Sequence, residues 1–295
     1  MKTIFIYIII IHSLLAADSI LFSETENYIT ANTEKTDNNI TIDWQEGRIY
    51  SSQHVEIKQD VNYAKSRILS IEKAKKKIKE SYLLFLSKLN YDSKNKVIDV
   101  ITADTNLNNK IYAWIDYAKL IKIDYPDLYS FIIVFKINLT GSDSLVDVFL
   151  RQTDVEQEIN INYSFFFKAE YTGLVIDARG LLETSGNKRE KLQPALFFRI
   201  LDQDGNVLYD RYRVKRNEIL KKGLVLYISD VNQNIVDRVG SNPLYTTCYR
   251  IYGKNKTDPI ISNKDASLMT SSQNSLEALK NGNVVIILDE DVLNL

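Results

Sequence analysis

Cysteine and histidine are scarce in this chain of 295 residues, which contains 1 Cys and 2 His. One cysteine excludes an internal disulfide, and a structural zinc site, which needs four nitrogen or sulfur ligands, is excluded as well. The 37 basic and 38 acidic residues leave a net charge of −1, so the chain as a whole has no electrostatic attraction to nucleic acid. The composition therefore argues against a zinc protein and against a nucleic-acid partner.

Glycine and proline are also few, with 10 Gly and 4 Pro. No two glycines stand in a G-x-G or G-x4-G-K arrangement, which excludes the dinucleotide-binding and Walker-type phosphate loops. Asp202–Asn206 is similar in composition to part of a calcium loop, but strand-like residues flank it and favour a hairpin turn. No local pattern selects a catalytic pair among the 38 acids. We therefore predict no enzyme activity, no cofactor and no metal.

The first 17 residues have the order of a secretory signal peptide. Lys2 supplies a positive charge, an apolar run from Ile4 to Ala17 follows, and small residues precede Asp18. The run is shorter than the roughly 20 residues that a membrane-spanning helix needs, although an uncleaved anchor is the alternative. The sequence therefore predicts a cleaved signal peptide over residues 1–17 and a periplasmic or outer-envelope location. Because no cysteine follows the apolar run, it predicts no lipoprotein anchor.

The next region combines strand and helix patterns. Residues 18–39 are polar and lack hydrophobic periodicity, which predicts a flexible leader. Residues 40–142 are predicted to form a small α+β domain of the order strand, helix, helix, strand. The expected elements are strands near 40–45 and 49–57 around Gly47, helices over 64–89 and 108–120, a turn over 122–127 and a strand over 131–139. The apolar stripe of the first helix is expected at Ile68, Ile71, Ile78, Tyr82 and Phe85.

The C-terminal part has shorter apolar runs separated by turn residues. Residues 143–165 are predicted to be a junction, and residues 166–295 a β-rich mixed domain, so the whole chain is predicted to be α+β. The expected elements here are strands over 174–179, 196–200, 207–209, 224–228, 245–252 and 284–288, with a helix over 266–279.

Two groups of charged residues are candidate interaction surfaces. The stretch from Ala64 to Glu80 has a local net charge of +5 and suits an anionic partner such as lipid headgroups, with a solvated helix face as the alternative. Its candidate residues are Lys73, Lys75, Lys76, Lys77 and Lys79. The second group is Asp177 and Arg179 on one face of a predicted strand, where a cross-strand ion pair that also involves Arg199 is the structural alternative.

Two residues are candidate reactive groups. His54 is the histidine left after export, and it lies in a polar segment with no link to a particular nucleophile, which predicts a surface histidine. Cys248 lies in a tyrosine-rich predicted strand, where a lone cysteine is usually a buried thiol.

Several blocks carry a resemblance. The sequence YTGLVIDARGL at Tyr171–Leu181 resembles a block in exported proteins of diderm bacteria, and the order of later blocks agrees: Pro194–Leu196, Arg199–Tyr209, Val239–Leu244, Ile260–Ala266 and Val284–Asp289. Upstream, Ile42–Gly47 and the helix after it are similar to the small domain of FlgP-type envelope lipoproteins, which are linked to flagellar assembly. The resemblance covers about residues 40–295, but this chain lacks the lipoprotein cysteine and inserts a charged loop at 183–192.

The resemblance implies a non-catalytic role. We expect an exported, non-enzymatic envelope protein that serves as a structural or assembly factor of the flagellum or outer envelope. Its expected partners are other envelope or flagellar proteins or a second copy of itself, with no nucleic acid. The alternatives are a periplasmic hydrolase that uses carboxylates or calcium, and a module that binds anionic lipid surfaces peripherally.

Overall fold

The structure is a computed structural model that describes residues 39–57, 62–150, 157–159, 170–184, 186, 188–230 and 232–293. The predicted signal peptide, nearly all of the predicted leader and much of the predicted junction lie outside the described residues. No helix within these ranges is long and apolar enough to cross a membrane.

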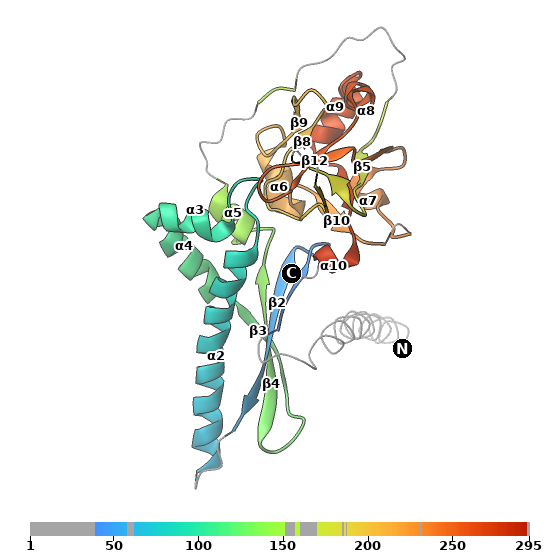
Figure 1. The fold of residues 1–295 in the computed structure, drawn as a ribbon. Helices are drawn as coiled ribbons and strands as arrows, with labels where there is room; N and C mark the ends of the chain where they lie inside the picture. The colour runs from blue at the N-terminus through green and yellow to red at the C-terminus, as the bar shows by residue number, and fades with distance from the viewer. Residues whose placement is uncertain are drawn as a thin grey trace, which may run out of the picture. The chain divides into compact units, whose positions relative to one another are not determined.

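The chain divides into two compact units. In the described ranges, unit 1 comprises residues 39, 51–57, 62–78 and 122–134, and unit 2 comprises residues 40–50, 79–121 and the described part of 135–293. Three elements run through both units: strand β2 (Arg48–Glu56), helix α2 (Tyr63–Lys88) and strand β4 (Ser130–Asn138). Helix α2, drawn in cyan in Figure 1, is 26 residues long and is the helix predicted over 64–89.

The N-terminal strands form a four-stranded sheet in the order β1-β2-β4-β3, where β1 is Asn39–Asp43 and β3 is Lys119–Asp124. The predicted break at Gly47 is confirmed as a turn between β1 and β2. Gly47 has a φ of +61°, and a Cβ there would lie 1.9 Å from the Thr140 hydroxyl oxygen. Only glycine fits this turn without a shift of its neighbour.

The apolar stripe predicted for α2 was wrong in its first half. Ile68 is 60 % exposed, whereas Ser66, Ser70 and Ala74 are buried. They share a spacing of four with the buried Ile78 and Tyr82, so the helix buries small side chains in its first half and large ones in its second. Prediction from hydrophobicity failed here because small residues allow close packing without being strongly apolar.

The second predicted helix is displaced. Helix α4 spans Thr105–Asp116, and Asp104 caps it by accepting hydrogen bonds from the backbone N–H groups of Asn106 and Leu107. A further helix, α3 (Val97–Ala103), was not predicted, and residues 119–121 belong to strand β3. Leu145–Phe149 is a short helix, α5, capped by Ser144.

The C-terminal part contains a fully parallel sheet, which the sequence did not indicate. Its order is β10-β14-β5-β11, and every neighbouring pair is parallel. The strands are β5 (Leu174–Asp177), β10 (Leu226–Ile228), β11 (Leu244–Thr247) and β14 (Val284–Ile287). All four residues of β14 are buried, as expected for a central strand covered on both faces.

A second four-stranded sheet is mixed, with the order β12-β13-β8-β9. Its strands are β8 (Ile200–Leu201), β9 (Val207–Tyr209), β12 (Arg250–Tyr252) and β13 (Asp258–Ile260). The hairpin predicted at 202–206 is confirmed, since β8 and β9 are antiparallel. The strand predicted over 245–252 is instead two strands in different sheets, β11 and β12. A two-stranded sheet pairs β6 (Leu182–Glu183) with β7 (Arg189–Glu190).

Helices complete this part of the chain (Figure 1). They are α6 (Arg216–Lys222), α7 (Val236–Val239), α8 (Asn263–Met269), α9 (Gln273–Lys280) and α10 (Glu290–Leu293). The helix predicted over 266–279 is therefore two helices, because α8 ends at Met269 and Ser272 caps a new helix. Helices and strands in several sheets confirm the predicted α+β class.

Candidate functional site

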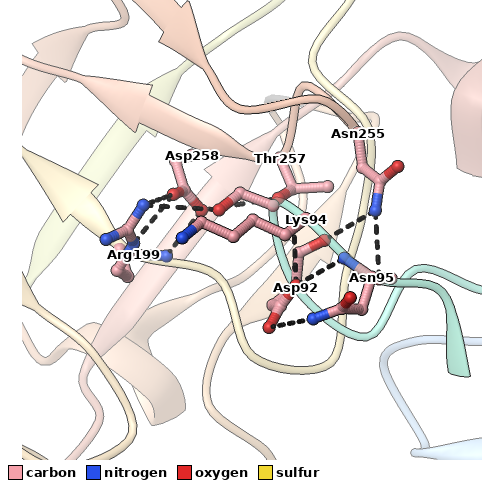
Figure 2. A network of polar contacts seen from close by, with 8 residues as sticks. Asp92, Lys94, Asn95, Arg199, Asn255, Thr257 and Asp258 are labelled. Atoms are coloured by element: carbon pink, nitrogen blue, oxygen red, sulfur yellow. Dashed lines mark hydrogen bonds and ion pairs between the residues drawn. The ribbon is translucent and has the colours of Figure 1, made fainter. Parts of the chain in front are cut away.

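A polar network joins the loop after α2 to the β12–β13 connection within unit 2 (Figure 2). Asp258, at the start of β13, is fully buried, and its carboxylate accepts hydrogen bonds from Arg199. The backbone N–H and Nε of Arg199 lie 3.0 and 2.9 Å from Oδ1 and Oδ2, and Nη2 lies 2.8 Å from Oδ2. Arg199 Nη2 also donates to the Ser93 hydroxyl at 3.3 Å.

The loop that carries Ser93 is itself held by side-chain hydrogen bonds. Asp92 Oδ1 accepts from the N–H groups of Lys94 and Asn95 at 2.8 and 2.7 Å, which closes a turn of the Asx type. Asn255 Nδ2 then donates to the carbonyls of Asp92 and Asn95 at 2.9 and 3.0 Å (Figure 2). Residues about 160 positions apart in the chain are thereby tied together.

The electrostatics of this network favour a structural role. Burial raises the pKa of the Asp258 carboxyl, while the N–H and the guanidinium of Arg199 act in the opposite direction. Both carboxylate oxygens accept hydrogen bonds, so the buried charge has the partners that its desolvation requires. A carboxylate engaged in this way is a poor catalytic base, and we interpret the network as a clamp.

The sequence left Arg199 available as a further partner for Asp177 and Arg179, but Arg199 pairs with Asp258 instead. Arg179 is the partner of Asp177, with its Nη2 2.6 Å from Oδ2 and its Nε 2.9 Å from Oδ1. The two residues lie two positions apart on one segment, so the pair is not cross-strand. The hydrogen bonds from Arg179 lower the pKa of Asp177, and both side chains stay partly exposed. No sequence pattern indicated Asp258 as the partner of Arg199, because the contact depends on tertiary structure.

A hollow of about 500 Å³ lies where the strands of the parallel sheet end. Its lining includes the last residue of each of the four strands: Asp177, Ile228, Thr247 and Ile287. Ile235, Tyr245, Thr246 and Asp265 complete the lining. The carboxyl ends of parallel strands are a common place for ligands and partners in open α/β sheets.

The carboxylate of Asp265 in this hollow already has donors. Oδ2 accepts from the hydroxyls of Thr246 and Ser262 at 2.7 and 2.8 Å. Since Asp177 is paired with Arg179, both acids of the hollow are engaged within the chain. The rest of the lining consists of three isoleucines, one tyrosine and two threonines.

Among the described residues, one face of the parallel sheet is covered only in part. Val175, Val285 and Ile287 on this face pack with Val239 of α7, a helix of four residues. Strand β11 lies at the end of the sheet order, and its Tyr245 is 65 % exposed. Strands of a parallel sheet are normally covered on both faces, so the exposure of β11 on this face is unusual.

Helix α7 is fixed in place beside the hollow. Arg238 is buried, and its guanidinium donates to the carbonyls of Lys222 and Gly223 at the end of α6, at 2.6 and 3.0 Å. Burial lowers the pKa of Arg238 to about 10, which still leaves it charged at neutral pH. The partial cover of the sheet therefore reflects the shortness of α7 and not a poorly attached helix.

The five candidate lysines all lie on α2. All are exposed, and Lys73 to Lys77 belong to unit 1, whereas Lys79 belongs to unit 2 and forms an ion pair with Asp116. Neither Asp177 nor Arg179 belongs to unit 1.

The two residues considered as reactive groups lie as predicted. His54 is exposed, and Cys248 is 5 % exposed, with burial raising the pKa of its thiol to about 12. A thiol with such a pKa is almost entirely protonated at neutral pH and is a poor nucleophile.

The turn considered as part of a calcium loop uses its carboxylate internally. Asp202 Oδ1 accepts from the N–H groups of Asp204 and Asn206, and Oδ2 accepts from Asn206 Nδ2. Across the described ranges, no group of three or more His, Cys, Asp or Glu side chains is placed to hold a metal ion.

Comparison with known families gives one match within this region. Residues 173–290 match a family model described as the second domain of Treponema pallidum Tp0624. The match begins directly before β5 and ends at the first residue of α10, so it contains the parallel sheet, the mixed sheet and the hollow. It covers less than half of the chain and has no link to FlgP-type lipoproteins, so that resemblance stays a prediction. No match to a curated protein was found.

Proposed function

We propose that the protein is a non-enzymatic, exported envelope protein that binds another protein across the open face of its parallel sheet. In this proposal it serves as a structural or assembly factor of the flagellum or outer envelope. The observation that carries the proposal is the exposure of Tyr245 on β11, beside a hollow whose lining includes three isoleucines. The free energy falls when a partner removes an apolar surface of this kind from water.

The chemistry of the surface suits a protein partner. Tyr245 offers a large ring with few rotatable bonds, and the hollow beside it is lined by Ile228, Ile235 and Ile287. Val236 of α7 is a further apolar contact, at 54 % exposure. Aromatic side chains next to a well-formed apolar pocket are typical of the residues that dominate binding energy in protein interfaces.

A hydrolase is the alternative that one observation favours, because Asp177 and Asp265 line the same hollow. Their carboxylates are held by Arg179 and by two hydroxyls, which supports binding more than acid–base catalysis. Asp265→Asn tests this alternative. Hydrolysis of an envelope polymer by the wild type that is lost in this variant would establish the enzyme and overturn the proposal.

The direct test is site-specific photo-cross-linking in cells that make the protein. A photoreactive phenylalanine replaces Tyr245, and in a control variant it replaces Tyr112 of α4, a tyrosine that is 51 % exposed. We expect a discrete adduct with an envelope protein from position 245 only, and we expect Val236→Glu to abolish it. Failure to form an adduct, or the same adducts from both positions, would contradict the proposal.

A further inference from the structure

Unit 1 exposes an unusual number of large apolar side chains. We call this set, together with the lysines that follow on α2, the tip surface. Its apolar members lie on the first turns of α2 and on the turn between β3 and β4: Tyr63, Ile68, Leu69, Tyr125, Leu128 and Tyr129. Leu128 is 74 % exposed, the highest value among the large apolar residues described.

Hydrogen bonds hold the turn in the shape that exposes Leu128. The Tyr63 hydroxyl donates to the Leu128 carbonyl at 2.6 Å, and the N–H of Ile57 donates to the Tyr129 carbonyl at 2.7 Å. Asp127 Oδ1 accepts from the N–H of Tyr129 at 2.6 Å. The carbonyl of Leu128 and both backbone groups of Tyr129 are thus fixed, and the Leu128 side chain is left exposed.

A cation–π contact anchors the other side of the turn. The guanidinium of Arg67 lies 4.4 Å from the centroid of the Tyr125 ring, and its Nε donates to the Tyr125 hydroxyl at 3.1 Å. Such a contact joins α2 to the turn and keeps the apolar groups of both on one rigid unit.

The tip surface is also basic. The described residues of unit 1 contain seven Lys or Arg and four Asp or Glu, which gives a net charge of +3. Lys73, Lys75 and Lys76 are exposed on α2, within three turns of Ile68 and Leu69. Of the nearby acids, Asp127 is engaged with Tyr129 and Ser130 in the turn.

We propose that the tip surface docks onto an anionic lipid bilayer, with Leu128 and the neighbouring rings in the interfacial layer and the lysines against the headgroups. Apolar groups beside a basic helix are the combination by which peripheral proteins bind membrane surfaces, and tyrosine rings are enriched at that depth. A second copy of the chain is disfavoured as the occupant, because two tip surfaces of net positive charge repel one another. The inference concerns unit 1 and does not depend on the hollow in unit 2.

Vesicle co-sedimentation of the chain without the predicted signal peptide tests the proposal, with vesicles of phosphatidylcholine alone and of phosphatidylcholine mixed with phosphatidylglycerol. We expect binding to the anionic vesicles only, with a strong decrease as salt rises. Leu128→Asn is expected to weaken binding about tenfold, because it removes one exposed apolar side chain from the interface. Reversal of Lys73, Lys75 and Lys76 to Glu is expected to weaken it at least about a hundredfold.

Matched controls separate the tip surface from general effects. Leu181→Asn changes a leucine of unit 2 that is 63 % exposed, and the triple reversal of Lys110, Lys254 and Lys264 to Glu makes the same change in net charge. Both controls are expected to bind like the wild type. The inference is overturned if the wild type does not bind anionic vesicles, or if control and test variants lose binding equally. It is overturned in favour of self-association if Leu128→Asn converts a dimer in sedimentation velocity to a monomer without changing vesicle binding.

Discussion

We predict that loss of the Arg199–Asp258 pair lowers the free energy of unfolding by a large amount. Asp258→Ala removes a fully buried carboxylate that accepts two hydrogen bonds from Arg199 and forms an ion pair with its Nη2, and it leaves the guanidinium without its anion. The loss of one partner of a buried pair costs about 3–5 kcal/mol. The side chain of Arg199 is 34 % exposed and can regain part of its hydration, so we expect about 3 kcal/mol.

Two further variants sharpen this prediction. Asp258→Asn keeps an acceptor for the backbone N–H of Arg199 but loses the charge, and we expect about half the cost of the alanine variant, or roughly 1.5 kcal/mol. Asp177→Ala is the matched control, because Asp177 also pairs with an arginine through both oxygens but on the surface, where such pairs contribute about 0–1 kcal/mol.

Urea unfolding followed by circular dichroism and fluorescence measures these differences as changes in midpoint at constant slope. Hydrogen exchange of the backbone amides of Asn95 and Asn255 gives a local measure, since both lie in the network that the pair supports. If Asp258→Ala and Asp177→Ala prove equally mild, within about 0.5 kcal/mol of the wild type, the interpretation of the network as a clamp is refuted.

Three other outcomes follow from the structure. Gly173→Ala should lower the free energy of unfolding in urea by about 2 kcal/mol, because its Cβ would lie 2.6 Å from a Val239 carbon. Gly186→Ala, with open space around it, should be neutral, and equal effects of the two variants would contradict the packing. Cys248, whose buried thiol has its pKa raised to about 12, should react with a thiol reagent at pH 8 only after unfolding, and complete labelling of the native chain would refute its burial. Hydrogen bonds lower the pKa of Asp127 from 3.8, so the carboxylate stabilises the turn above pH 3.8 and this stabilisation is lost as the pH falls through the lowered pKa. The N–H chemical shift of Tyr129 should follow this titration, and a midpoint above 3.8 would contradict the prediction.

The sequence predicted the elements whose signal is local. Helix α2 and strand β4 have long periodic patterns, and the turn at 202–206 has residues that tolerate its backbone geometry. The parallel pairing of β5 with β14 was not predictable in this way, because it joins residues about 110 positions apart and depends on connections with no local signature. The division of 245–252 between two sheets was also missed, because this tyrosine-rich run contains no Gly or Pro that marks a break.

The candidate site was predictable only in part. Exposure of the α2 lysines and the burial of Cys248 follow from composition and pattern. The partner of Arg199 could not be predicted, because Asp258 is distant in the chain and closer acids were available. The apolar exposure of Leu128 and Tyr245 also escaped prediction, since a hydrophobic residue in a turn or an edge strand is indistinguishable in sequence from one that faces the core.

Binding of the cross-linked envelope partner is the most direct measure of the central claim that this protein acts through the open face of its parallel sheet. Titration calorimetry with the purified partner compares the wild type with Tyr245→Ala and with Tyr112→Ala. We predict that Tyr245→Ala raises Kd at least about tenfold, as truncation of a central interface aromatic does, and that Tyr112→Ala leaves it unchanged. The same Kd for all three proteins would contradict the account.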